Sequence, residues 1–96
     1  MYDLIPTASF QHSLKSILKD NKTLKIRINK TLQLLSSNPN YPSLKSHKVN
    51  TKNYGQRWSS WVTGDMRIIW DYDNANRLVI LLLDIGSHSG KHKVYK

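Results

Sequence analysis

The chain has 96 residues, enough for a single domain over residues 1–96 with one hydrophobic core. It contains no cysteine, which excludes disulfide bonds and thiolate metal sites and is compatible with a reducing cytoplasm. The first residues carry neither a basic segment nor a long apolar one. We therefore expect no signal peptide, no membrane span and a cytoplasmic location.

The charge is strongly unbalanced. Fifteen Lys and Arg residues stand against six Asp and no Glu, for a formal net charge of +9. This excess favours a polyanionic partner, most often nucleic acid, or an acidic protein. The lysines are spread along the chain and do not form one amphipathic helix, which disfavours a membrane surface. The alternative is that the charge only keeps the protein soluble.

The N-terminal third predicts a strand followed by two helices. Tyr2–Pro6 alternates like an edge strand, and Pro6 suits its end. Apolar residues recur at helical spacing over 8–20 and again over 22–37, with a break at Asp20-Asn21. The short break predicts an antiparallel helical hairpin.

The middle of the chain carries weaker signals. The segment 38–43 contains two prolines and ends the second helix. Residues 44–56 are polar and basic, and we expect them to form an exposed, mobile connection. Residues 57–63, RWSSWVT, predict a strand that turns at Gly64-Asp65.

The stretch from Gly64 to Ser89 predicts the centre of the sheet. Two runs rich in Ile, Val, Leu and aromatic residues, 66–72 and 78–85, flank the turn residues 73–76 and predict a hairpin. Alternation puts Arg67 on the face opposite Met66 and Ile68. His88 follows the second run directly. An arginine on a sheet face near a histidine at a strand end is a candidate active centre; the alternative is an ordinary hairpin with polar surface residues.

The predicted order is β-α-α-β-β-β, an α+β fold with a helical hairpin packed on a small, mostly antiparallel sheet. The motifs GDMRIIWDYD, LLLDIGSHS and the terminal VY, in this order and spacing, resemble the RelE/ParE superfamily of bacterial toxins from toxin–antitoxin pairs. The resemblance covers nearly the whole chain. It implies a ribosome-dependent messenger-RNA endoribonuclease that is held inactive by a cognate antitoxin and acts on the ribosome and mRNA without a cofactor.

The resemblance also implies site residues. In the RelE branch a strand arginine, a basic residue after the last core strand and a C-terminal tyrosine correspond to Arg67, His88 and Tyr95. In the YafQ-like branch, a histidine in the connection and an aspartate before the strand correspond to His47 and Asp65. Lys91 or His92 could take the place given to Tyr95. The expected RNA- or ribosome-binding residues are Lys48, Lys52, Arg57, Lys91, His92 and Lys93.

The chain departs from both branches. Two strand lysines of RelE fall on Trp58 and Ser60, and a second histidine of the YafQ-like pattern falls near Trp61. These differences favour a histidine-assisted site over a lysine-assisted one. Two alternatives stay open: a ParE-like inhibitor of DNA gyrase, and a nucleic-acid- or antitoxin-binding module with a decayed site.

The residue types suit metal-independent RNA cleavage. The reaction needs a base for the 2′-OH, a cation for the phosphoryl oxygens and an acid for the leaving 5′-oxygen. Histidine serves either proton role near neutral pH, and arginine binds phosphate with a planar fork of donors. We expect His88 to be the acid or base, Arg67 the phosphate ligand and Tyr95 a stacking or proton-transfer partner. The scattered histidines and aspartates show no paired spacing typical of a metal site.

Overall fold

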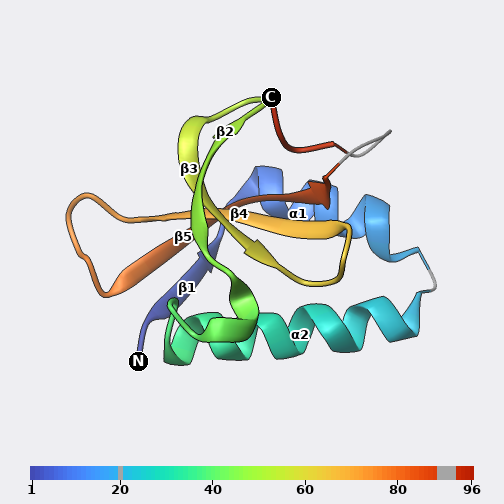
Figure 1. Ribbon diagram of the computed structural model, residues 1–96, viewed down its shortest axis with the longest axis horizontal. Helices are drawn as coiled ribbons and strands as arrows, with labels where there is room; N and C mark the ends of the chain where they lie inside the picture. Colours follow the sequence, from blue (N-terminus) through green and yellow to red (C-terminus); the bar gives the residue numbers. More distant parts are fainter. Residues whose placement is uncertain (20, 89–92) are drawn as a thin grey trace.

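The computed structural model of the chain describes residues 1–19, 21–88 and 93–96. Its elements are β1 (Asp3–Pro6), α1 (Ala8–Leu18), α2 (Lys22–Ser37), the short 3-10 helix η1 (Pro42–Leu44), β2 (His47–Thr51), β3 (Gly55–Trp61), β4 (Met66–Tyr72) and β5 (Val79–Ser87). The five strands form one sheet in the order β1-β5-β4-β3-β2 (Figure 1). Only the β1–β5 pair is parallel. The predicted α+β class, two helices with a mostly antiparallel sheet, is confirmed.

Both predicted helices form, and each has a side-chain cap. The Thr7 hydroxyl accepts a hydrogen bond from the Phe10 amide, and the Asn21 side chain accepts one from the Leu24 amide at 3.0 Å. These caps satisfy amide groups that have no partner within the helix. The first helix ends at Leu18, two residues before the predicted end. No described helix combines the length and the apolar composition needed to cross a membrane.

The prediction that residues 44–56 form only an exposed connection, without a strand, is wrong. The segment contains the end of η1, the whole of β2 and the start of β3. Beyond its pairing with β3, β2 contacts the C-terminal tail: the Lys52 amide donates to Val94, and the Lys96 amide donates to Asn50. Figure 1 shows the C-terminus beside the β2–β3 hairpin. The sequence gives no apolar pattern for this strand, because the strand is paired through its backbone and its side chains are largely exposed.

One face of the sheet forms the core with both helices. Phe10 of α1 and Ile28 and Leu35 of α2 are buried against residues of β4 and β5. The largest of these strand residues, Trp70, is 1% exposed and stacks on Trp58 with 5.6 Å between ring centroids. Trp58, which the sequence resemblance aligns with a RelE lysine, is partly buried and packs against this core.

A chain of hydrogen bonds ties this core to the loop after α2. The Trp70 indole N–H donates to the Ser60 hydroxyl at 2.8 Å, and the Ser46 hydroxyl donates to the Pro39 carbonyl at 2.7 Å. The two serine hydroxyls lie 2.6 Å apart. Because the Ser46 proton is used on Pro39, Ser60 must donate to Ser46. Ser60, the second departure from the RelE lysines, thus has a structural role.

The Ser60→Ala variant should lower the free energy of unfolding by about 1–3 kcal/mol, because it leaves the buried Trp70 N–H without a partner. Urea denaturation measures this loss. Ser37→Ala, at an exposed serine of α2, is the control and should change the free energy by less than about 0.5 kcal/mol. Adding Ser60→Ala to a Trp70→Phe background should cost less than in the wild type, since the donor is already gone. An undiminished stability of Ser60→Ala would contradict the hydrogen-bond chain.

Candidate functional site

The candidate site lies on the sheet face opposite the helices. In an extended strand, successive side chains point to opposite faces, so Arg67 of β4 points away from the core that holds Ile68. Trp61 of β3 is the cross-strand partner of Arg67, and Gly86 of β5 is its partner on the other side. The glycine offers no side chain, which leaves room for the guanidinium beside the indole.

Arg67 is buried to an extent that the sequence did not indicate. Its side chain is 4% exposed, and its guanidinium carbon lies 4.1 Å from the centre of the Trp61 ring. Among the described residues the single ion pair is Arg57–Asp71, so within them Arg67 has no carboxylate partner. A buried charge of this kind requires other compensation.

Backbone carbonyls of the β3–β4 turn supply part of that compensation. Arg67 Nη1 donates to the carbonyls of Thr63 at 2.9 Å and Met66 at 3.1 Å, and Nη2 donates to the carbonyl of Gly64 at 3.1 Å. Nε is buried and has no hydrogen-bond partner among the described residues. These three bonds hold the guanidinium in a fixed orientation.

His88 is exposed and stands directly after β5. Its backbone amide donates to the Asp65 carbonyl at 2.8 Å, which ties it to the β3–β4 turn. Its imidazole meets the Tyr95 ring edge to face, with centroids 4.9 Å apart. The turn that holds Arg67 thus also positions His88.

His47 stands at the start of β2, on the same side as Trp61. Its Nδ1 lies 2.8 Å from the Lys45 carbonyl oxygen, which can only accept a hydrogen bond. Nδ1 therefore carries a proton, and in the neutral imidazole the lone pair is on Nε2. Lys45 itself has a left-handed backbone (φ 48°), and its ammonium lies 4.2 Å from the centre of the Trp61 ring.

Tyr95 is brought to the site by the C-terminal tail. The tail forms a bridge to Thr51 of β2 through Tyr95 and another to Ser87 of β5 through Lys93. The phenol oxygen of Tyr95 lies 2.7 Å from the hydroxyl of Ser59, which is fully buried.

These elements enclose a small cavity of about 130 Å³, lined by His47, Trp61, Arg67, His88 and Tyr95. The structure therefore brings together four of the five residues predicted to be catalytic. Asp65, the fifth, is exposed and does not line the cavity; its backbone carbonyl holds His88. Two further predicted residues, Lys91 and His92, lie outside the described part of the chain.

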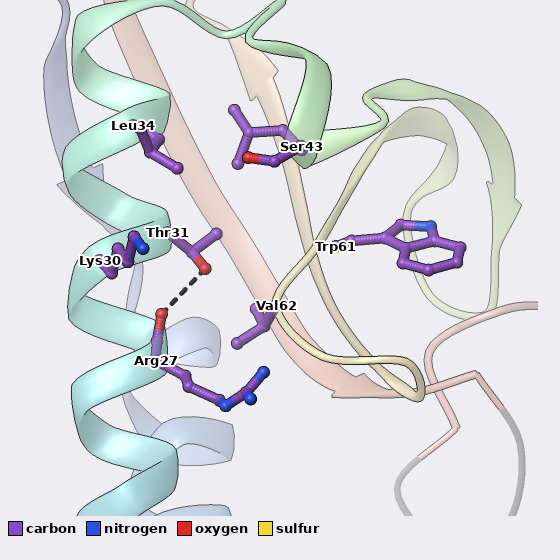
Figure 2. A pocket seen from close by; sticks show the side chains of 8 residues that line it. Arg27, Lys30, Thr31, Leu34, Ser43, Trp61 and Val62 are labelled. Carbon is purple, nitrogen blue, oxygen red and sulfur yellow. Dashed lines mark hydrogen bonds between the residues drawn. The ribbon is translucent and has the colours of Figure 1, made fainter.

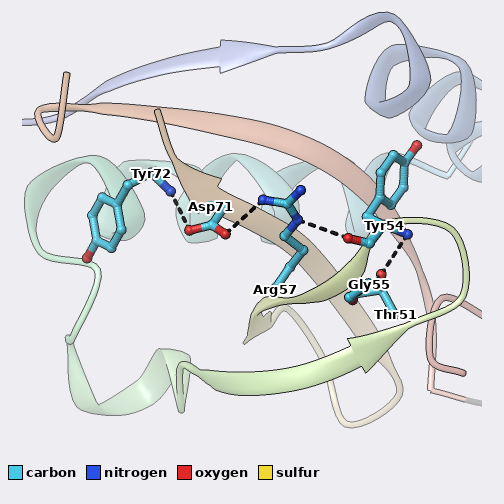
Figure 3. Close-up of polar contacts among 6 residues, drawn as sticks. All are labelled: Thr51, Tyr54, Gly55, Arg57, Asp71 and Tyr72. Carbon is cyan, nitrogen blue, oxygen red and sulfur yellow. Dashed lines mark hydrogen bonds and ion pairs between the residues drawn. The ribbon is translucent and has the colours of Figure 1, made fainter. Parts of the chain in front are cut away.

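The predicted RNA-binding residues divide into two kinds. Lys48, Lys52 and Lys93 are exposed, and the Lys48 ammonium lies 5.3 Å from the centre of the Trp58 ring. Arg57 instead pairs with Asp71 at 3.1 Å and donates from Nε to the Tyr54 carbonyl at 3.0 Å (Figure 3). These contacts indicate that Arg57 fixes β3 to β4 and to the β2–β3 turn.

Two residues of the site carry no clear signal in the sequence. Trp61 stands out there only as a departure from a family histidine, although its indole covers Arg67. Ser59 gives no signal because a small hydroxyl residue is common in a strand. Its alternation with Trp58 and Ser60 does put it on the face of Arg67. Within the described residues, no three His or Asp side chains are close enough together to hold a metal ion.

A second, larger hollow of about 360 Å³ lies beside this cavity, between α2, η1 and the end of β3. Trp61 lines both. Figure 2 shows its indole pointing away from α2.

The chain shares its fold with toxins of known structure. A metal-bound toxin from Helicobacter pylori superposes with a TM-score of 0.70 at 20% identity, over 92% of this chain and 96% of the other. The E. coli DinJ–YafQ complex superposes with a TM-score of 0.68 at 18% identity, over 92% of this chain and 94% of the matched one. The Staphylococcus aureus YoeB dimer superposes with a TM-score of 0.61 at 16% identity, over 86% of this chain and 92% of the other. Neither a protein-family model nor a curated protein sequence matches the chain.

The predicted resemblance is thus confirmed in the fold, which is that of YafQ, YoeB and the H. pylori toxin. At these identities the comparison carries no residue roles. The arrangement around Arg67 is read from this chain's own contacts.

Replacing Trp61 should show how far the indole supports Arg67. Trp61→Leu should lower the free energy of unfolding by about 1–2 kcal/mol, because the buried guanidinium loses its aromatic partner. Trp61→Phe, which keeps a ring, should lose less. Lys45→Ala is the control for the other cation on the same ring and should cost little, since Lys45 is exposed. Equal stability of the Leu and Phe variants in urea denaturation would contradict a supporting role for the ring.

Proposed function

We propose that the protein is a toxin of a type II toxin–antitoxin system that cleaves messenger RNA on the ribosome. The observation that carries this proposal is the convergence of two histidines, a tyrosine and a buried arginine on one small cavity. Arg67 lines this cavity and has no anionic partner among the described residues, so it can bind a phosphate group there.

The contacts favour a division of roles. His47 has its proton on Nδ1, so its Nε2 lone pair can accept the proton of the 2′-OH. The 2′-oxygen then forms a bond to phosphorus, and the bond from phosphorus to the 5′-oxygen breaks. His88, on the other side of the cavity, donates a proton to that 5′-oxygen, and Tyr95 orients its ring. The products are a 2′,3′-cyclic phosphate and a 5′-hydroxyl.

Arg67 stabilises the charge that develops on the phosphoryl oxygens. Its orientation is set before substrate arrives by three carbonyl contacts and the Trp61 ring, so little reorganisation is needed in the transition state. The exposed Lys52 and Lys93 would add to the attraction of the RNA backbone, whereas Lys48 lies over Trp58, which faces away from the site.

An antitoxin and the ribosome are the proposed partners. The YafQ structure was determined as a complex with DinJ, and a protein of the same fold with a net charge of +9 suits an acidic or otherwise complementary partner of its own. Action on ribosome-bound message implies that the protein works in the cytoplasm.

Replacing either His88 or Arg67 should abolish most RNA cleavage and leave the fold intact. His88→Ala should reduce the cleavage rate about a hundred- to ten-thousand-fold, because His88 donates a proton. Arg67→Lys keeps the charge and should still cost about a hundredfold, because lysine cannot make the same set of carbonyl and phosphate contacts. The assay is single-turnover cleavage of ribosome-bound message, mapped by primer extension.

The control is Lys25→Ala, which removes an exposed cation from α2 outside the site and should cut at nearly the wild-type rate. Circular dichroism and melting check each fold. A folded His88→Ala protein that cuts at the wild-type rate would remove His88 from the mechanism. A wild-type protein that leaves message intact but blocks supercoiling by gyrase would support the ParE-like alternative.

A further inference from the structure

The larger hollow beside Trp61 has the features of a ligand site. Its volume of about 360 Å³ is near the lower end of the range for small-ligand pockets, about 300–1,000 Å³. It is lined by Arg27, Lys30, Thr31, Leu34, Ser43, Leu44, Trp61 and Val62. These residues come from three elements distant in the sequence, α2, η1 and the end of β3 (Figure 2).

Two cations stand at the α2 side of this hollow. Arg27 and Lys30 are three residues apart, which places them on neighbouring positions of one helix face. Both are exposed, and neither belongs to an ion pair among the residues that the structure describes. They can bind one or two phosphate groups without first breaking another interaction.

Thr31 adds a hydrogen-bond acceptor to the hollow. Its side chain is buried, at 5% exposure, and its hydroxyl proton is donated to the Arg27 carbonyl at 2.9 Å (Figure 2). The hydroxyl oxygen therefore offers only acceptor lone pairs to a ligand. Such a group selects a ligand donor, for example the exocyclic amine of a nucleobase, over a carbonyl oxygen.

Apart from Ser43, the remaining walls are apolar. Leu44 is buried, Leu34 and Val62 are half-buried, and all three line the hollow. A planar base can lie against such a surface while its sugar-phosphate stays near the cations. Single-stranded RNA is commonly bound in this way, with the base in a pocket and its edge read by polar groups.

We propose that this hollow is a second nucleotide subsite, which binds a nucleotide of the RNA next to the one cleaved and prefers a base with an exocyclic amine. The inference rests on the proposed function, because the hollow and the catalytic cavity share the lining residue Trp61 and the same RNA strand would occupy both. An acidic peptide would use only the two cations. A nucleotide also uses the Thr31 acceptor and the apolar walls, and the observations favour it.

The test measures binding separately from cleavage. Fluorescence anisotropy follows the binding of labelled 2′-O-methyl hexamers of cytidine and of uridine, which cannot be cut because the 2′-oxygen is blocked. Cytosine and uracil have nearly the same shape, but cytosine carries an amine where uracil carries a carbonyl. The wild type should bind the cytidine hexamer about threefold to tenfold more tightly, the effect of about one hydrogen bond.

Two kinds of variant separate charge from base recognition. Arg27→Ala and Lys30→Ala should weaken both hexamers alike and reduce the salt slope of log affinity by about 0.7 for each phosphate that is no longer neutralised. Lys25→Ala, on the same helix but outside the hollow, should change the slope less. Thr31→Val, which keeps the shape, should remove the preference for cytidine and leave the affinity for uridine unchanged.

A variant that fills the hollow tests the subsite without altering the fold. Ser43 is exposed, so Ser43→Trp should preserve the melting temperature and weaken both hexamers at unchanged charge. The subsite is overturned if Ser43→Trp binds like the wild type, if Thr31→Val keeps the cytidine preference, or if Lys25→Ala has the same effect as Arg27→Ala. It is also overturned if these variants bind RNA normally and instead lose affinity for a polyglutamate peptide. Loss of cleavage alone, with hexamer binding as described, would overturn the proposed function and not the subsite.

Discussion

The site depends on one buried charge. Arg67 lies in the sheet with no described carboxylate beside it, and an uncompensated charge in that position would cost several kcal/mol. Three carbonyls of a single turn, the face of Trp61 and the missing side chain of Gly86 make the position tolerable. A protein that needed only stability would gain more from an apolar residue here. The buried Nε has no hydrogen-bond partner among the described residues.

The pleat of the sheet places the core residues on one face and the residues of the candidate site on the other. Ser60, Trp58 and Trp70 face the helices and form the core, and their neighbours on the same strands face the site. Because alternate residues point to opposite faces, the core can be packed tightly without constraining the cavity. The C-terminal tail brings Tyr95 to His88 on the second face.

Much of the fold follows from local sequence signals. The helix over 22–37 and the strand over 66–72 form with the predicted bounds, because their apolar residues repeat with a clear period and their ends carry capping or turn residues. The strand β2 could not be predicted, since its pairing depends on β3 and on a tail more than forty residues away. A polar edge strand has no periodic apolar signal to reveal it.

The site followed from sequence only in part. Arg67 and His88 stood out because an arginine in an apolar strand and a histidine after one are unusual. The tautomer of His47 and the phenol–hydroxyl contact between Tyr95 and Ser59 depend on tertiary contacts that no local pattern encodes. The same holds for Arg57, which looks like a free cation in the sequence and is paired with Asp71 in the fold.

We propose above all that Arg67 binds an anion and that the residues around it fix its orientation before the anion arrives. The most direct measurement is the ¹H–¹⁵N resonance of its Nε–H during titration with a 2′-O-methyl dinucleotide, with the signal assigned by its loss in Arg67→Lys. Arg57 is the internal control, because its Nε already donates to the Tyr54 carbonyl. The Arg67 signal should shift and saturate while the Arg57 signal stays in place. An unchanged Arg67 signal at saturating ligand, or equal shifts at both arginines, would contradict the claim.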